Sequence, residues 1–391
     1  MKKHLDRAVV LGVLAAMLLA LALSVLRPKD INYYENRTAN QMPELSLSAW
    51  MHGEYQDALE AALTDQVPAA QGLNRTYHQT TNRYLRSVLK RFSARYPNRY
   101  FHFHDMLLFG DDYITFFPTW LEERKSDLDA KAENYNAVFA QHPELNFYVY
   151  YIEKDTDIEL DTGLKTGASD YILNALDLPE ARKGCFRVDS FEEYSQWFFR
   201  TDHHWNYAGS YRAYTQVMQL LGKDAVLAPQ SLDFIADGMT GSKAKVTGSD
   251  ELFVEPFYAY RYDFPPMEIT INGSPAADYG RQSDTFTEAD YGQVNYGSFY
   301  GGDDGEICFH TGNAGAGNLL VIGESYDNAL LKLIASSYEN TYSIDLRNYE
   351  REIGVPFSFS DYVAAHGITD VLLIGSMAYF TLEDFRLEDA A

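Results

Sequence analysis

Two hydrophobic patterns alternate along the chain and together predict an α/β fold. Apolar residues that recur at helical spacing, with charges between them, predict surface helices. These stretches are residues 47–63, residues 73–92 and Leu121 to His142. Short unbroken runs of apolar, aromatic and β-branched residues predict strands buried on both faces, as in a parallel sheet. Such runs are Phe147 to Ile152, Leu319 to Ile322, Thr341 to Leu346 and Asp370 to Ile374.

The stretch from Ser325 to Glu339 joins two of these runs. Its apolar stripe predicts a helix that crosses between parallel strands, as a βαβ connection requires. The stripe consists of Ala329, Leu330, Leu333 and Ile334. Residues 233–315 differ in being rich in Gly, Tyr and Asp, with Asn272-Gly273 closing a short β-like piece. We expect a β-rich insertion there.

The first 27 residues have the pattern of an export segment. Lys2, Lys3 and Arg7 precede a small and apolar run from Ala8 to Leu26. A run of about 20 such residues suits a retained signal-anchor, with the basic residues kept in the cytoplasm. Cleavage after Ala20-Leu21-Ala22 is the alternative, which would give a secreted protein.

The predicted organisation follows from this segment. Residues 1–27 form the signal-anchor, and the polar, Pro-bounded residues 28–44 form a stalk. Residues 45–391 form one domain with a parallel central sheet, an N-terminal helical region and the β-rich insertion. Everything beyond the anchor is expected to be extracytoplasmic.

Composition narrows the choice of partners. The chain of 391 residues carries a formal net charge of −24, which argues against nucleic acid and against charge-driven adhesion to anionic lipid. Cys185 and Cys308 are too few for a disulfide framework, although one bridge is compatible with export. No cofactor-binding motif is found. The 30 Tyr and 23 Phe include rings that could stack on sugars, although most are expected in the core.

The segment Thr201-Asp202-His203-His204-Trp205 is the strongest candidate for chemistry. In an extended segment Asp202 and His204 share a face while His203 points away. Asp202 can then orient His204 as a general base, and Trp205 packs beneath the turn or lines a sugar site. Asn206 is a good N-cap for a helix over residues 207–221, which would hold the segment still.

A candidate nucleophile follows one of the predicted central strands. In Gly323-Glu324-Ser325-Tyr326, Gly323 permits a tight turn and Ser325 lies at the carboxyl end of the strand, where open α/β sheets place their active groups. Free N–H groups at the following helix would suit an oxyanion. The structural alternative is that Ser325 only caps that helix.

These motifs resemble those of the bacterial DHHW protein family. The resemblance rests on Phe199 to Asn206, on Gly209-Ser210-Tyr211 and on Gly323 to Tyr326, and further agreement comes from Glu35-Asn36-Arg37, Asp65-Gln66-Val67-Pro68, Tyr148 to Glu153 and Asp345-Leu346-Arg347. That family is similar to the SGNH-hydrolase-like domains of alginate O-acetyltransferases. The resemblance implies an SGNH-hydrolase-like fold with Ser325 as nucleophile, His204 as base and Asp202 as orienting acid.

The resemblance also implies acyl-ester chemistry on a cell-envelope or exported polysaccharide. Gly323, Tyr326, Trp205 and Arg347 are the candidates for oxyanion or substrate binding, and Arg347 alternatively forms a salt bridge at the sheet edge. For a transferase the implied partner is a membrane-bound O-acyltransferase. Glu324 departs from the family pattern, and the backbone N–H of Ser325 is the one oxyanion donor that can be named.

Two other functions compete with the serine esterase or O-acetyltransferase. One is a non-catalytic SGNH-like protein for glycan binding or assembly with an acyltransferase. The other is a metal-dependent hydrolase that uses Asp202, His203 and His204, with His102 or His104 as further ligands. We rank the metal site last, because an extended segment sends neighbouring histidines to opposite sides.

Overall fold

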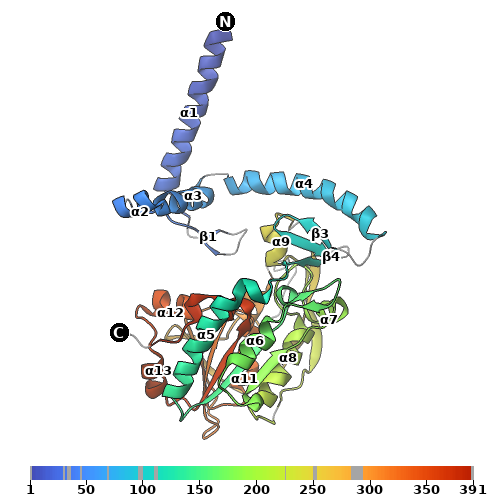
Figure 1. The fold of residues 1–391 in the computed structure, drawn as a ribbon, viewed down its shortest axis with the longest axis vertical. Coiled ribbons are helices and arrows are strands. Elements are labelled where there is room, and N and C mark those ends of the chain that lie inside the picture. The colour runs from blue at the N-terminus through green and yellow to red at the C-terminus, as the bar shows by residue number, and fades with distance from the viewer. Residues whose placement is uncertain are drawn as a thin grey trace. The chain divides into compact units, whose positions relative to one another are not determined.

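The computed structural model describes residues 2–29, 31–32, 37–44, 46–67, 70–95, 100–109, 113–224, 226–249, 253–282 and 294–388. The chain divides into two compact units. The first comprises Met1–Pro97 and Ser242–Phe253, and the second comprises Asn98–Gly241 and Val254–Ala391 (Figure 1). The predicted boundaries at residues 27, 44 and 45 were drawn from composition and stay a prediction.

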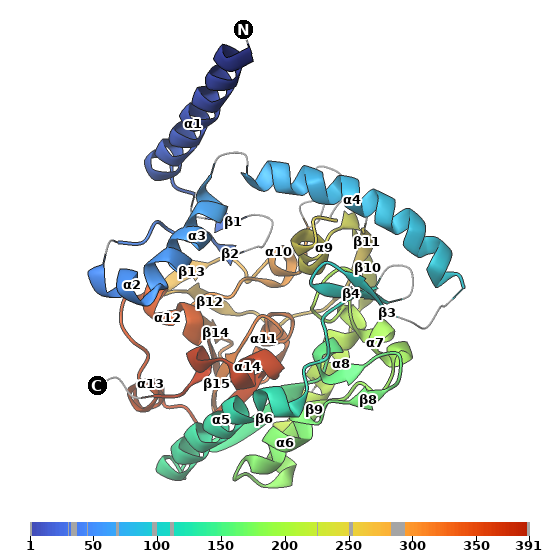
Figure 2. The ribbon, with the colours of Figure 1, turned by 45° about the horizontal axis from the view of Figure 1, so that its top comes forward.

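An eight-stranded mixed sheet forms the centre of the second unit, with strand order β13-β12-β14-β16-β15-β17-β6-β9. In Figure 2 the labelled strands of this sheet follow one another in the order β13, β12, β14, β15, β6 and β9. The five strands from β16 to β9 are parallel, and the three others run antiparallel. The strands are β6 (Asn146–Ile152), β9 (Lys183–Phe186), β12 (Glu268–Ile271), β13 (Ser274–Ala276), β14 (Glu306–His310), β15 (Asn318–Gly323), β16 (Asn340–Ile344) and β17 (Asp370–Ser376).

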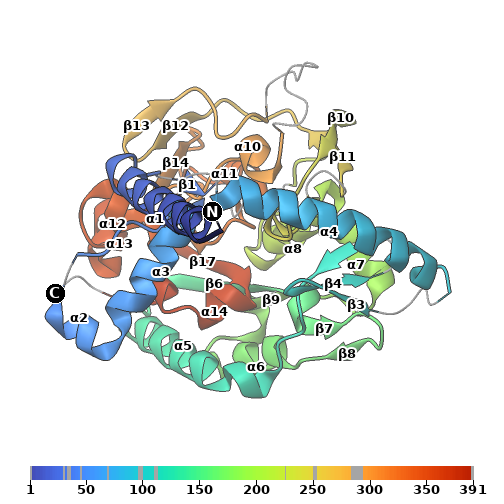
Figure 3. The ribbon, with the colours of Figure 1, turned by 90° about the horizontal axis from the view of Figure 1, so that it is seen from above.

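Helices cover both faces of this sheet, so the predicted α/β class with a parallel centre is confirmed. One face packs on α8 (Tyr207–Leu220) and α11 (Asn328–Ala335). The other packs on α5 (Leu121–Gln141), α6 (Ala168–Ala175), α13 (Phe359–His366) and α14 (Met377–Thr381). Figure 3 shows α5, α6 and α14 on the opposite side of the central strands from α8 and α11.

The predicted β-rich region is not one structural piece. Strands β10 (Ser231–Met239) and β11 (Glu255–Arg261) form a separate two-stranded sheet, whereas β12, β13 and β14 extend the central sheet. Asn272 and Gly273 both have positive φ, of 49° and 73°, so they close the β12–β13 hairpin as predicted. Residues 242–253 belong to the first unit, and residues 283–293 lie outside the described part of the chain.

Several short strands had no clear signal in the sequence. They are β3 (Tyr100–Phe103), β4 (Met106–Phe109), β5 (Tyr113–Thr115), β7 (Ile158–Glu159) and β8 (Leu164–Lys165), and the edge strand β9 was also missed. Cys185 lies on β9 and Cys308 on β14, and both thiols are free. The possible disulfide is therefore not formed.

The first unit is mainly helical. It contains α1 (Lys2–Leu26), α2 (Leu47–His52), α3 (Glu54–Gln66), α4 (Ala70–Ser93) and α9 (Ser242–Val246), with the short strands β1 (Ile31–Asn32) and β2 (Arg37–Thr38). The single helix predicted over residues 47–63 is wrong, because Gly53, at φ 86°, ends α2 in the left-handed conformation. No helix in the described part of the chain combines the length and apolar character that a membrane span needs.

Buried polar groups at the end of α3 hold the predicted stalk. Asp65 accepts hydrogen bonds from the backbone and side-chain nitrogens of Asn40 at 2.7 and 3.0 Å. Gln66 accepts from the Lys29 backbone nitrogen at 2.6 Å and donates to the carbonyls of Lys29 and Asn40. The conspicuous Asp65-Gln66 pair is thus structural, while Glu35, Asn36 and Pro68 of the resembling motifs lie outside the described residues.

Candidate active site

The segment that carries the candidate base is a closed loop. The antiparallel bridge between Phe198 and Trp205 closes it, and the Phe199 N–H donates to the His204 carbonyl at 3.1 Å. Between them Thr201 to His204 form a series of bends. The expectation of an extended segment is therefore wrong, although Asp202 and His204 still meet.

A turn brings these two side chains together. Asp202 Oδ1 accepts hydrogen bonds from the His204 backbone N–H at 3.0 Å and from its Nδ1 at 2.6 Å. Both residues are buried, with exposed fractions of 4% and 7%. Because the carboxylate binds the ring and the backbone of the same residue, it fixes the orientation of the imidazole and places a proton on Nδ1.

Ser325 lies on the other side of the imidazole. Its Oγ is 2.7 Å from His204 Nε2, which completes an unbroken chain of hydrogen bonds from Asp202 to Ser325. Strand β15 ends at Gly323, and the Asp327 N–H donates to the Glu324 carbonyl at 2.8 Å, so that Ser325 projects from a tight turn. The structural alternative for Ser325 fails, because Asp327 occupies the N-cap position of α11.

The glycine before this turn is required by close packing. A Cβ at Gly323 would lie 2.1 Å from Asp327 Oδ2 and 2.9 Å from Ile374 Cγ2. Glu324, the departure from the family pattern, is buried and its Oε1 accepts a hydrogen bond from the Ser376 N–H at 2.6 Å. Glu324 therefore ties the turn to the end of the neighbouring strand β17.

Two aromatic rings lie against the imidazole of His204. Tyr296, from α10 (Tyr296–Tyr300), lies parallel to it at 3.8 Å between centroids and an interplanar angle of 2°. His203 lies on it at 3.8 Å and 37°, so His203 does not point away as predicted. An aromatic face favours a positive charge above it, so the Tyr296 ring would stabilise the imidazolium form of the base.

Two of the predicted substrate-binding residues are buried in the site's support. Trp205 is 0% exposed and packs on Phe186 and Tyr326, so it lies beneath the turn and does not line an open sugar site. Tyr326 is 1% exposed, and its hydroxyl donates to the His203 carbonyl. Burial, with the nearby carboxylates of Asp155, Glu324 and Asp202, raises its pKa well above the usual value, so the phenol stays protonated.

Arg347 forms ion pairs with acidic neighbours. Arg347 lies on α12 (Leu346–Ile353), which begins beside the end of β16. Its guanidinium pairs with Asp345 and, at 2.8 Å, with Asp303. Asp327 is buried beside this group, where burial first and then Asp303, Asp345 and Glu324 raise its pKa well above the ordinary value. The predicted salt bridge of Arg347 is thus present in place of a free anion-binding group.

Two supporting residues had no recognisable signal in the sequence. Glu255 on β11 is buried, and its carboxylate accepts from the Thr201 N–H at 2.8 Å, from the Thr201 hydroxyl at 2.7 Å and from the Arg200 N–H at 3.1 Å. Tyr296 follows His204 by 92 positions in the sequence. Glu255 and Tyr296 contact the loop only because the chain folds to bring them there. In contrast Asn206 caps α8 as predicted, accepting from the Ala208 and Gly209 N–H groups.

One group of side chains in the described part of the chain could hold a metal ion. One ligand atom each from Asp202, His203 and His204 lies within 4.8 Å of the others. His203 and His204 are therefore not sent to opposite sides, contrary to the prediction for an extended segment. However, both ring nitrogens of His204 are engaged, by Asp202 and by Ser325, so a bound ion would compete with that chain of hydrogen bonds. His102 and His104 are exposed and are not in the group.

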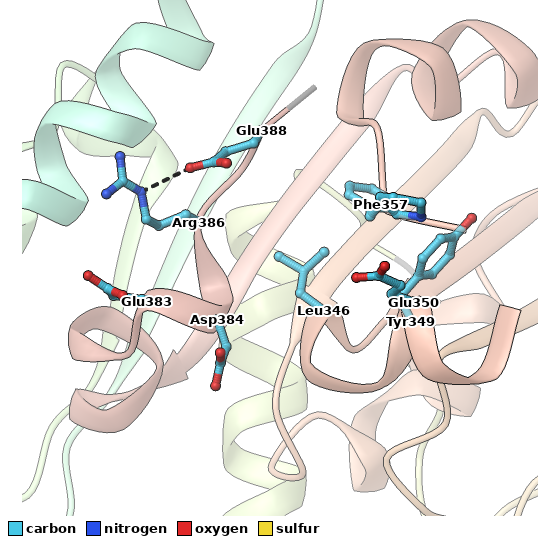
Figure 4. A pocket seen from close by; sticks show the side chains of 9 residues that line it. Leu346, Tyr349, Glu350, Phe357, Glu383, Asp384, Arg386 and Glu388 are labelled. Atoms are coloured by element: carbon cyan, nitrogen blue, oxygen red, sulfur yellow. Dashed lines mark ion pairs between the residues drawn. The ribbon is translucent and has the colours of Figure 1, made fainter. Parts of the chain in front are cut away.

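A separate hollow of about 390 Å³ lies between α12 and the C-terminal segment (Figure 4). Its charged residues are mostly acidic, and Arg386 pairs with Glu388 at 3.3 Å. It is lined by Leu346, Tyr349, Glu350, Pro356, Phe357, Glu383, Asp384, Arg386 and Glu388. None of the predicted site residues lines it.

Comparison with known proteins agrees with the geometry. Residues 185–344 match the family model described as DHHW protein. The predicted resemblance to the DHHW family is confirmed. The matched region contains the DHHW segment itself, Asp202 to Trp205, and the turn that carries Ser325. A comparison with curated proteins finds no match.

Solved structures share the fold. A DHHW family protein from Eubacterium siraeum DSM 15702 has a TM-score of 0.55 and 18% identity, covering 74% of this chain and 98% of its own. Bacillus cereus PatB1 with a sulfonyl adduct has a TM-score of 0.55 and 19% identity, covering 73% and 97%. The O-acetyltransferase domain of Pseudomonas putida AlgJ has a TM-score of 0.39 and 12% identity, covering 73% and 94%. At their identities, the first two structures establish the fold and not the activity.

Proposed function

We propose that this protein is an extracytoplasmic serine esterase or O-acetyltransferase that acts on a cell-envelope or exported polysaccharide. The observation that carries the proposal is the hydrogen-bonded chain Asp202–His204–Ser325, with distances of 2.6 and 2.7 Å. A hydroxyl, an imidazole and a buried carboxylate in this order are the parts of an activated serine nucleophile.

The proposed reaction has two halves. Ser325 Oγ attacks the ester carbonyl carbon and gives its proton to His204 Nε2, and the alcohol leaves with that proton to form acyl-Ser325. His204 then takes a proton from the acceptor hydroxyl as its oxygen attacks the acyl carbon, and it gives this proton to Ser325 Oγ as the bond between Oγ and the acyl carbon breaks. A sugar hydroxyl as acceptor gives transfer, and water gives hydrolysis. For transfer, a membrane-bound O-acyltransferase is the proposed source of acetyl groups.

An aromatic surface near the DHHW segment favours a glycan as acceptor. Phe234 and Tyr258 are cross-strand partners on β10 and β11, and they are 49% and 36% exposed. Next to them Tyr260 lies 5.0 Å from Tyr207, which follows Asn206 directly in the chain. Tyrosine rings offer an apolar face and a hydroxyl to a sugar. Replacing Phe234 and Tyr258 by Ala should raise KM severalfold for acetyl release from acetylated cell-wall polysaccharide.

The first test is ester turnover by the full-length protein in detergent, with p-nitrophenyl acetate as substrate. We expect turnover in the wild type and its loss in Ser325→Ala and His204→Ala. A sulfonyl fluoride should label Ser325, as read by peptide mass spectrometry. The structure of the similar protein PatB1 carries a sulfonyl adduct. A folded wild type that neither turns over nor labels would favour the non-catalytic glycan-binding or assembly protein.

A metal requirement is tested with the same protein. We expect turnover to survive dialysis against a chelator, because the proposed mechanism uses both nitrogens of His204 for proton transfer and orientation. Activity that is lost on dialysis and restored by a divalent ion would replace the serine mechanism with the metal-dependent one.

A further inference from the structure

Lys154 is a buried lysine whose ammonium has no anionic partner. It is 6% exposed, and its Nζ lies 4.8 Å from the ring centroid of Phe116 and 6.0 Å from that of Tyr326. Within the described residues no carboxylate or carbonyl accepts a hydrogen bond from this ammonium. Lys131 and Lys332, which are equally buried, do have such acceptors, the Leu382 carbonyl and Asp278.

An unpaired buried charge is costly, so its presence calls for a reason. Most of the Lys154 side chain is shielded from water, although the ammonium itself keeps some contact with solvent. A poorly solvated ammonium without a partner is unfavourable in a protein. The two aromatic faces return part of this free energy by attracting the cation. They also fix the direction of the side chain without neutralising its charge, which leaves the ammonium available to an anion.

Lys154 lies at the same edge of the sheet as Ser325. Strands β6 and β15 both flank β17, and the registers align Gly323 with Ile374 and Ile374 with Tyr150. Ser325 and Lys154 follow β15 and β6 at their carboxyl ends, where open α/β sheets bind their ligands. Tyr326 connects the two positions. It follows Ser325 directly in the sequence, and its ring centroid lies 6.0 Å from Lys154 Nζ and 5.0 Å from the ring centroid of His204.

The proposed reaction needs a positive group beside Ser325, because negative charge develops on the carbonyl oxygen of the ester. When Ser325 Oγ bonds to the ester carbon, the π electron pair of the carbonyl moves onto oxygen and creates an oxyanion, while the serine proton moves to His204. The Ser325 N–H, which has no acceptor among the residues that the structure describes, offers one hydrogen bond to that oxygen. One neutral donor leaves most of the new charge without compensation.

We propose that the Lys154 ammonium stabilises this oxyanion. The inference rests on the proposed function, since it needs an acyl group on Ser325. The charge acts in a water-poor site, where a fixed cation is worth more than in bulk water. When the intermediate collapses, the electron pair returns to re-form the carbonyl and the alcohol leaves with the proton from His204, so Lys154 gains and loses no proton.

The test compares Lys154→Gln and Lys154→Arg with wild type in full-length protein, using p-nitrophenyl acetate. We expect kcat of Lys154→Gln to fall by about 10² to 10³ with KM nearly unchanged, which is the signature of an interaction made only in the transition state. Lys154→Arg keeps the charge and should retain more of kcat than Lys154→Gln.

Lys223→Gln is the matched control. Its Nζ also rests on a ring, 3.8 Å from the centroid of Tyr338, and donates to the Ala316 carbonyl just before β15 begins. That position is at the amino end of the strand, away from Ser325, so its kcat should equal that of wild type. Lys154→Met, which preserves contact with the two rings, replaces the glutamine variant if that one unfolds.

The outcomes separate the two proposals. Wild-type protein without turnover or sulfonyl labelling rejects the serine mechanism itself. Active wild type with an unchanged kcat in Lys154→Gln rejects the role of Lys154 alone. A raised KM at constant kcat also rejects it, because the lysine would then bind the ground state. If neither uncharged variant folds, Lys154 is structural and the proposal fails.

Discussion

In the proposed reaction His204 first accepts the proton of Ser325 and then gives it to the leaving alcohol, and its neighbours orient it for both steps. Asp202 holds Nδ1 and the backbone N–H, Tyr296 covers one face, and Nε2 remains for Ser325. A serine hydroxyl is a weak nucleophile at neutral pH, so its reactivity rests on this oriented base.

At the residue scale the first prediction concerns Asp202→Asn. The amide has nearly the same shape, but its NH₂ group can donate to Nδ1, which favours the tautomer with the proton on Nε2 and facing Ser325. We expect kcat for p-nitrophenyl acetate to fall by about 10³ to 10⁴ with the fold intact. Asp170→Asn, an exposed carboxylate paired with Arg187, is the control and should keep wild-type turnover. Equal rates in Asp202→Asn and wild type would remove Asp202 from the mechanism.

A second prediction at this scale uses Asp327→Asn and pH. Burial raises the pKa of Asp327 well above its ordinary value and that of Asp345 to about 6. A carboxyl with a raised folded pKa contributes stability below its unfolded pKa of about 4, and this is lost as pH rises through the folded pKa. The unfolding temperature should therefore fall between pH 5 and pH 8.

The Asn variant carries no charge to bury. The stability of Asp327→Asn relative to wild type should be greater at pH 8 than at pH 5 by at least about 1 kcal/mol, as measured by thermal and urea unfolding. Exposed Asp177→Asn should change neither value. A wild type that is more stable at pH 8 than at pH 5 contradicts the prediction.

At the element scale, α8 holds the DHHW loop through a close approach. A Cβ on Gly209 would lie 2.2 Å from the Trp197 carbonyl oxygen and 2.8 Å from Trp205 Cβ. The helix therefore packs directly against the bridge that closes the loop. Gly209-Ser210-Tyr211 belongs to the motifs that resemble the DHHW family, and this close packing explains why a glycine is needed at position 209.

We accordingly expect Gly209→Ala to damage both stability and turnover. The added methyl group must displace α8 or the loop, which typically costs about 1–3 kcal/mol, and the shift would move His204 from Ser325. Gly297→Ala in α10 is the control, because its new Cβ would meet nothing closer than Asn295 Oδ1 at 3.7 Å. Urea unfolding and ester turnover of the two variants measure the difference. Wild-type stability in Gly209→Ala would contradict the packing argument.

At the scale of the whole molecule, the proposed location outside the cytoplasm rests on the first 27 residues. We propose that they anchor the protein, with Lys2, Lys3 and Arg7 in the cytoplasm. The full-length protein expressed in bacteria should fractionate with membranes, and its intact mass should include residues 1–27. A mature N-terminus after Ala22 would show cleavage and favour the secreted alternative. Protein that is soluble with an intact N-terminus would contradict both.

Residue patterns along the chain were enough to predict the central strands and the positions that carry the candidate chemistry. Unbroken apolar runs identified β6, β15, β16 and β17, because strands covered on both faces can contain few polar residues. The strand-turn-helix pattern around Ser325 and the N-cap at Asn206 could also be predicted, because both depend on residues that are close in sequence. Local physics is enough for features of this kind.

The surroundings of those positions depend on the folded arrangement of distant segments. Glu255, Tyr296 and Lys154 reach the site from other elements, so their roles depend on chain crossings that local pattern does not encode. The bends at Asp202 to His204 likewise follow from the bridge between Phe198 and Trp205 and not from propensity. Short strands such as β9 were missed because pairing with β6, rather than their own composition, makes them strands.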